Sequence, residues 1–122
     1  MKLHLTTAEN NNLITGYDDN FIEVNKQRYS QSLIIMAQLL NTDWPVQDFS
    51  QLTEAHMVTI TALNPEVVLL GTGKKHQFLH PKIYQALTQK GIPLECMTTA
   101  AACRTYNILM SEGRTVVAAL IL

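Results

Sequence analysis

The sequence predicts a single α/β domain, with α+β character, in which an N-terminal β-meander is followed by alternating helices and strands. In the first third of the chain, apolar residues alternate with polar ones between turns rich in Asn and Asp, which is typical of antiparallel hairpins. In the second half, short continuous apolar runs alternate with segments of helical periodicity, as in strands that helices cover on both faces. The predicted order is therefore a meander and then αβαβαβ, with a central mixed sheet and two or three helices packed on it.

The meander is predicted over residues 13–36. A strand at 13–17 precedes the Asp-Asp-Asn turn at 18–20, and the next strand follows at 21–24. A second turn begins at Asn25-Lys26 and leads into the segment 28–36. This turn is a weaker signal than Asn-Gly, because only glycine takes positive φ at the second position without cost.

The break at residues 44–46, Trp-Pro-Val, begins a connection with no clear element of its own. A helix is expected after it, with Thr53 as N-cap and with Leu52 and Met57 placed as a hydrophobic staple. This helix should end before the Asn64-Pro65 pair, because the residue before proline resists the α region.

The next two elements are a strand and a helix. Residues 67–70 form a continuous apolar run, which predicts a strand covered on both faces. Pro81 suits the first position of a helix, and Gly91 suits its C-terminal end. The apolar stripe of this helix would consist of Ile83, Ala86 and Leu87.

The last three elements are a strand at 94–97, a helix capped by Thr98 or Thr99, and a strand at 115–122. Gly113 is placed to end the helix. The residues expected to face inward from this helix are Thr105, Ile108 and Leu109.

Length, composition and charge define the class of protein. A chain of 122 residues suits one domain, residues 1–122, with a small core. Its 47% hydrophobic and 16% charged residues are typical of globular proteins. Its net charge of −1 provides no basic field of the kind that duplex nucleic acid requires, so we expect no nucleic-acid partner.

No targeting or membrane segment is expected. Residues 1–7 contain no apolar signal region, and the most apolar run, 116–122, is far shorter than the roughly 20 residues that span a bilayer. A bacterial-type cytoplasmic protein without an integral membrane segment is therefore predicted. Cys96 and Cys103 are expected to be reduced, buried thiols.

A first candidate binding segment follows the strand at 67–70. It consists of Gly71-Thr72-Gly73, where glycine would allow positive φ or close backbone approach, and of Lys74 and Lys75 beside it. Free amides next to two cations suit a phosphate or a carboxylate. The pattern lacks the third glycine of G-x-G-x-x-G and the Gly-Lys-Ser/Thr ending of a P-loop. A tight turn with solvated lysines is the alternative interpretation.

A second candidate segment opens the third helix. The small residues 100–102 would let its first turn approach the sheet, and its free amides would attract an anion. Arg104 would add a bidentate contact, and the helix terminus would lower the pKa of Cys103. Core packing is the alternative role for Cys103, because no histidine is assigned to it as a base.

Both segments follow strands that are expected to be parallel neighbours, so their loops should meet at one sheet edge. Tyr106 and Asn107 would line the resulting crevice or bond locally to the backbone. The residues assigned to this crevice are Gly71, Thr72, Gly73, Lys74, Lys75, Thr98, Thr99, Cys103, Arg104, Tyr106 and Asn107.

No metal, cofactor or catalytic set is predicted. His76 and His80 have the four-residue spacing of metal ligands on a helix, but Pro81 indicates that the helix begins only after them. No third ligand accompanies them in the sequence.

Three pieces of the second half together resemble a known family. They are Gly71-Thr72-Gly73, the stretch 91–99, and the stretch 102–114, which reads Ala-Cys-Arg-Thr-Tyr-Asn-Ile-Leu-Met-Ser-Glu-Gly-Arg. From about residue 13 to its end, the chain resembles the small domain-of-unknown-function family that includes the mitochondrial NADH dehydrogenase (complex I) assembly factor 3. The resemblance implies a central mixed sheet between an α layer and a β+α layer, and it implies no established catalytic residues.

Two functions are compatible with these observations. The first is a non-catalytic accessory or assembly-type protein that acts through contacts with an unidentified protein partner. The alternative is a small-molecule anion-binding protein or a small enzyme that uses the crevice between residues 71–75 and 98–104. The sequence leaves open whether the protein forms a homo-oligomer.

Overall fold

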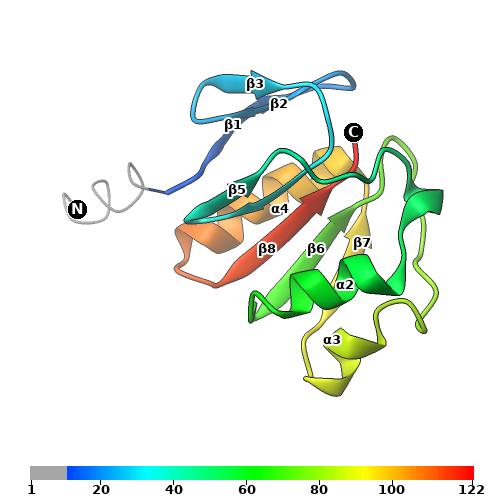
Figure 1. The fold of residues 1–122 in the computed structure, drawn as a ribbon. Helices are drawn as coiled ribbons and strands as arrows, with labels where there is room; N and C mark the ends of the chain where they lie inside the picture. Colours follow the sequence, from blue (N-terminus) through cyan, green and yellow to red (C-terminus); the bar gives the residue numbers. More distant parts are fainter. Residues whose placement is uncertain (1–10) are drawn as a thin grey trace.

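The computed structural model describes residues 11–122, which form two β-sheets with helices packed against them (Figure 1). The prediction made for residues 1–7 lies outside the described residues. The elements, in chain order, are β1 (Ile14–Tyr17), β2 (Ile22–Val24), β3 (Gln27–Tyr29), β4 (Leu33–Met36), β5 (Leu39–Asn41), the 3₁₀-helix η1 (Phe49–Gln51), α2 (Glu54–Thr61), β6 (Val67–Gly71), α3 (Gln85–Gln89), β7 (Leu94–Met97), α4 (Thr99–Ser111) and β8 (Val116–Leu120).

The smaller sheet is the antiparallel meander β1-β2-β3. Its first turn is closed by Asp18, whose carboxylate oxygen Oδ1 accepts hydrogen bonds from the backbone N–H groups of Asn20 and Phe21. Asn25 and Lys26, in the second turn, both have positive φ, 50° and 73°. This backbone suits a tight two-residue hairpin, because its twist matches that of the flanking strands.

The larger sheet has the order β5-β4-β8-β6-β7. Strand β6 lies parallel to both β7 and β8, whereas β4 is antiparallel to β8 and to β5. The mixed character of this sheet confirms the predicted fold class.

The structure differs from the prediction at residues 28–36, which do not form one strand. Strand β3 ends at Tyr29, and β4 begins at Leu33 in the larger sheet. The reason is burial. Leu33, Ile34 and Ile35 are all buried, which suits an interior strand, whereas Gln27 and Arg28 of β3 are exposed. Strand β5, which pairs with β4, was not predicted.

Each face of the larger sheet packs against a separate core. On one face, Leu69 and Leu120 contact a cluster completed by α4 and by β1 and β2 of the smaller sheet. On the other face, Val68 and Leu70 pack with α2, α3 and the segment that contains Trp44. The sheet therefore lies between an α layer and a β+α layer, as the family resemblance implied (Figure 1).

Helix α2 forms as predicted. The Thr53 side chain accepts a hydrogen bond from the His56 N–H, and the His56 ring accepts one from the Thr53 N–H. Each side chain thus provides the hydrogen-bond partner for the backbone N–H of the other residue. Leu52 and Met57 both lie in the core beneath the helix. Within residues 11–122, α2 and the other helices are too short or too polar to cross a bilayer.

Helix α3 is shorter than predicted. Pro81 opens a turn, in which the Tyr84 N–H donates to the Pro81 carbonyl, and the helix begins only at Gln85. Leu87 is buried, whereas Ala86 and Ile83 are half-buried. Of the three residues of the predicted apolar stripe, only Leu87 is therefore fully buried in the core.

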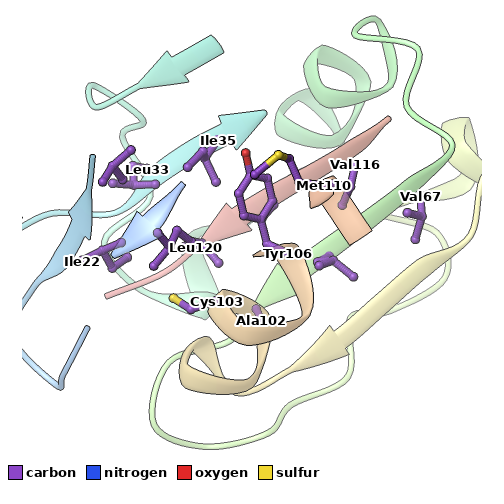
Figure 2. Packing of buried hydrophobic residues seen from close by; sticks show 14 residues of the cluster. Ile22, Leu33, Ile35, Val67, Ala102, Cys103, Tyr106, Met110, Val116 and Leu120 are labelled. Atoms are coloured by element: carbon purple, nitrogen blue, oxygen red, sulfur yellow. The ribbon is translucent and has the colours of Figure 1, made fainter. Parts of the chain in front are cut away.

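The inward face of α4 was predicted correctly only in part, since Leu109 packs half-buried against the core but Thr105 and Ile108 do not point into it. Its buried residues are Thr99, Ala102, Cys103, Tyr106 and Met110, whereas Ile108 has 59% of its surface exposed. Figure 2 shows Cys103, Tyr106 and Met110 pointing from α4 into the core. The spacing 99, 102, 103, 106, 110 follows one helical face, and the contact that fixes this face is the approach of Thr99 to Gly71.

Gly71 is the residue that allows this approach. A Cβ atom added to Gly71 would lie 2.9 Å from Thr99 Oγ1, 3.0 Å from Thr99 Cα and 3.1 Å from a Leu120 methyl carbon. Two of these three contacts are with Thr99, in the first turn of α4, and the packing of α4 on the sheet determines the position of this turn. The neighbours of Gly71 therefore have little freedom to move.

We therefore expect Gly71→Ala to lower the free energy of unfolding by about 1–3 kcal/mol, because the new methyl group overpacks the joint between β6 and α4. Urea unfolding followed by circular dichroism measures this change. The matched control is Gly16→Ala, where the nearest atom would be 3.4 Å away. The control should leave stability unchanged or raise it by up to about 1 kcal/mol, and equal losses in both variants would contradict the close-approach argument.

Candidate functional site

The loops after β6 and β7 meet at one edge of the sheet, which confirms that part of the prediction. The Thr99 N–H donates to the Gly73 carbonyl at 3.0 Å, and the Gly73 N–H donates to Thr99 Oγ1 at 2.9 Å. Gly73 has φ of 95°, and no atom lies within 4 Å of where its Cβ would be. Gly73 is therefore required for its backbone conformation, whereas Gly71 is required for space.

The Thr99 hydroxyl joins a third segment to these two. It is buried and donates to the Ile121 carbonyl at 2.5 Å, just after β8 ends. The Ile121 N–H in turn donates to the Gly71 carbonyl at 3.0 Å. The ends of β6 and β8 and the start of α4 are thus held together by one side chain.

A cleft of about 740 Å³ lies over this junction. Its size is within the range of small-molecule and peptide sites. Part of its lining is apolar and includes Phe49, Ile121 and Leu122. The full lining consists of Tyr17, Asp18, Asp19, Gln47, Asp48, Phe49, Thr72, Gly73, Lys74, Lys75, Thr98, Thr99, Ala100, Ile121 and Leu122.

The charges at the cleft have both signs. Lys74 Nζ lies 3.7 Å from Asp19 Oδ2, and both side chains are more than two-thirds exposed, so this ion pair is weak. Asp18 and Asp48 each accept hydrogen bonds from nearby backbone N–H groups in their own turns. Lys75 is exposed on the same rim.

Three backbone amides of the two loops bond within the protein. The Thr72 N–H donates to the Met97 carbonyl, the Gly73 N–H to Thr99 Oγ1, and the Ala101 N–H to Thr98 Oγ1. These three N–H groups are therefore not available to a ligand. This differs from a phosphate-binding loop, whose free N–H groups point at the ligand.

Five of the residues predicted for the crevice do not line it. Arg104 is exposed beside the cleft, where its guanidinium donates to the hydroxyl oxygen of Tyr17 at 2.9 Å. Cys103, Tyr106 and Asn107 point instead toward the core or toward the smaller sheet. Gly71 lies at the end of β6, where it packs against Thr99. The other six predicted residues line the cleft together.

Tyr106 and Asn107 fasten the smaller sheet to α4. The Tyr106 hydroxyl donates to the Asn12 carbonyl at 2.8 Å. The Asn107 side chain accepts from the Ile14 N–H at 3.0 Å and donates to the Ile14 carbonyl at 2.7 Å. The amide of Asn107 thus pairs with β1 as a neighbouring strand would.

The predicted lowering of the Cys103 pKa is wrong. The thiol is fully buried, and burial raises its pKa from an ordinary value near 9 to about 12, which outweighs the nearby Arg104 charge. Cys96 is half-buried rather than buried, and burial raises its pKa as well. The two free thiols lie in the cores on opposite faces of the sheet.

The two histidines between β6 and α3 lie outside any helix. His80 Nδ1 accepts a hydrogen bond from the Lys82 N–H, which starts the turn before α3, and His76 contacts the Phe78 ring. Among the described residues, no group of three or more His, Cys, Asp or Glu side chains is arranged to hold a metal ion.

The other wall of the cleft was not predicted from the sequence. Tyr17, Asp18 and Asp19 come from the end of β1 and its turn, and Asp48 and Phe49 come from the start of η1. Nothing in the local sequence of these segments points to residues 71–75. Their meeting depends on how the smaller sheet docks on α4.

The fold and the cleft define a small mixed-sheet α/β protein with a ligand-sized cleft at the carboxyl ends of its parallel strands. The chain belongs to the family described as Protein of unknown function (DUF498/DUF598), whose model matches residues 14–121.

Its relatives include NADH dehydrogenase [ubiquinone] 1 alpha subcomplex assembly factor 3 of Mus musculus, which is 34% identical over 110 residues. This match covers 88% of the chain, and the chain spans only 59% of the mouse protein. A 13 kDa major membrane protein of Francisella tularensis is 36% identical over 95 residues, or 76% of each chain. A crystal structure of a Bordetella parapertussis protein, 41% identical, superposes with a TM-score of 0.86 and covers 91% of this chain and 95% of that one.

The Thr99 hydroxyl can be tested by substitution. Thr99→Val keeps the shape but leaves the Gly73 N–H and the Ile121 carbonyl without their partner, so we expect a loss of about 2 kcal/mol or more in the free energy of unfolding. Thr99→Ser keeps the hydroxyl and should lose about 1 kcal/mol or less. Chemical unfolding of both variants measures the difference, and equal losses would show that the hydroxyl bonds are not the cause.

The Cys103 thiol gives a pH dependence. Its pKa is higher in the folded than in the unfolded protein, so its contribution to stability is complete below about pH 9 and is lost as the pH rises toward 12. In that window the wild type should lose about 1.4 kcal/mol per pH unit more than Cys103→Ala, in which only this titration is removed. Urea unfolding across the pH series measures the two slopes. Parallel slopes would mean that Cys103 ionises equally in both states.

Proposed function

We propose that this protein is a non-catalytic accessory protein of the assembly type that binds a segment of a partner protein in the cleft beside Thr99. The observation that carries the proposal is the composition of the cleft. Apolar side chains lie among separate carboxylate and ammonium groups, while the N–H groups of Thr72, Gly73 and Ala101 are already bonded within the protein.

This composition suits a peptide better than a single small anion. An extended segment presents apolar and charged side chains at intervals, and the half-buried Phe49 and Leu122 offer the first kind of contact. Asp48 and Lys75 offer the second, on the same cleft. A small anion would instead meet Asp18 and Asp19 as well as the lysines, and the carboxylates would oppose it.

The residues around the cleft give little support for a catalytic role. Cys103, the candidate nucleophile predicted from the sequence, is fully buried and holds its proton because burial raises its pKa. A nucleophile requires access and a partner that removes its proton. The assembly-factor name of the mouse relative favours the same proposal.

The test is site-specific photo-crosslinking in the cells that make the protein. A benzoylphenylalanine at position 49 reports on the cleft, and the same group at position 58 reports on the exposed side of α2, where Val58 is half exposed. We expect one partner to cross-link at 49 and not at 58. Ala100→Trp, which fills the cleft, should abolish the product, and the control Ala55→Trp on exposed α2 should retain it.

A cross-link that persists in Ala100→Trp would contradict binding in the cleft. The alternative, a small-anion site, is examined by thermal shift with phosphate, sulfate, nucleotides and small carboxylates against chloride at equal ionic strength. The proposal expects no specific rise in the melting temperature. A rise that Lys75→Gln removes would favour the anion-binding function instead.

A further inference from the structure

The segment between β6 and α3 is basic and carries an exposed aromatic residue. Residues 74–82 read Lys-Lys-His-Gln-Phe-Leu-His-Pro-Lys, with three lysines, two histidines and no acidic residue. The segment runs outside the sheet on its β7 side (Figure 1). Its first two lysines line the cleft, whereas residues 76–82 lie outside the cleft lining.

Phe78 projects from this segment into solvent. It is 81% exposed, the most exposed large apolar side chain among the described residues. Within residues 11–122, the one aromatic ring that contacts it is that of His76, with 4.5 Å between ring centroids. An aromatic side chain held in water loses the stabilisation that burial would give it, so its position calls for an apolar environment.

The backbone on both sides of Phe78 is anchored. The buried Thr72 hydroxyl oxygen lies 2.5 Å from the Lys75 carbonyl oxygen and accepts a hydrogen bond from the Gln77 N–H. On the other side, Leu79 is 94% buried in the core, since only 6% of its surface is exposed. The exposed aromatic ring is therefore presented from a fixed loop.

Charges surround the ring unevenly. Lys75 and Lys82 are exposed on either side of it in the sequence, and Lys74 lies near Asp19 at 3.7 Å. One carboxylate, that of Glu95, lines a shallow hollow beside Phe78. The segment and its margins therefore carry three ammonium groups and two carboxylates.

We propose that residues 74–82 bind the surface of an anionic lipid membrane, with Phe78 inserted at the headgroup level and the lysines against lipid phosphates. A bilayer deforms around one projecting aromatic ring, and cations next to it add electrostatic attraction. A protein partner would need about 800 Å² of complementary surface for a stable interface, and a loop of nine residues with one exposed apolar side chain does not provide it.

Vesicle flotation with the full chain tests the proposal. Vesicles of phosphatidylcholine are compared with vesicles that also contain about 30 mol% phosphatidylglycerol. We expect binding to the anionic vesicles only, weakened when salt rises from about 0.1 M to about 0.5 M. Phe78→Ala should reduce the partition coefficient about tenfold, and Lys82→Gln should reduce it about fivefold.

Matched controls separate this loop from general effects. Ile108→Ala removes an exposed apolar side chain on α4, and Lys26→Gln removes an exposed cation in the β2–β3 turn. Both should bind as the wild type does. Because Phe78 and Lys82 do not line the cleft, a failure here leaves the cross-linking result at position 49 unaffected.

Insertion into the bilayer is measured with the variant Phe78→Trp. Its fluorescence emission should shift to the blue with anionic vesicles and be quenched by brominated lipid chains. The native Trp44 is buried and provides a constant background. The proposal is overturned if wild type does not prefer anionic vesicles or if Phe78→Ala binds equally. Equal competition by polyglutamate or duplex DNA, without an effect of Phe78→Ala, would show a general polyanion surface instead.

Discussion

The hydroxyl of Thr99 is the interaction on which most of this structure depends. It accepts from the Gly73 N–H and donates to the Ile121 carbonyl, so it closes the gap between the two parallel strands β6 and β8 and the helix that packs across them. Gly71 makes the contact feasible, because any side chain there would meet Thr99 or Leu120. With this end of α4 fixed, the rotation of the whole helix is fixed, and Cys103 and Tyr106 become the core residues.

That rotation also positions the smaller sheet. When Tyr106 points inward, the next residue, Asn107, faces β1 and forms two hydrogen bonds with the backbone of Ile14. Strand β1 ends at Tyr17, which lines the cleft and accepts a hydrogen bond from Arg104. One wall of the cleft is thus positioned through α4 by the same threonine that lies in the other wall. A change in the packing of α4 should alter the shape of the cleft even where no cleft residue is replaced.

The sequence predicts well what depends on neighbouring residues. The strand at 94–97 has its predicted bounds, and the caps at Thr53 and Thr98 lie where the side-chain chemistry indicated. Ile108 was wrongly expected to face inward because it is apolar, whereas the docking of Thr99 on Gly71 decides which side of α4 is buried. The residues Tyr17 to Asp19 and Asp48 to Phe49 were missed for a related reason. They reach the cleft through tertiary packing, which leaves no periodic or spaced signal in their own segments.

The Gly-Thr-Gly segment shows why a binding motif and a structural motif are difficult to distinguish by sequence. Gly71 gives room to α4, the Thr72 hydroxyl holds the loop that follows, and Gly73 turns the chain with φ of 95° and bonds to Thr99. The same three residues that suggested free amides for an anion therefore direct their amides and hydroxyl into the protein. The exposed side chains lie further along the chain and are those of Lys74, Lys75 and Phe78. The rigid part of the segment thus supports two surfaces, the cleft on one side and the aromatic loop on the other, and interactions at either can be altered without disturbing the junction at Thr99.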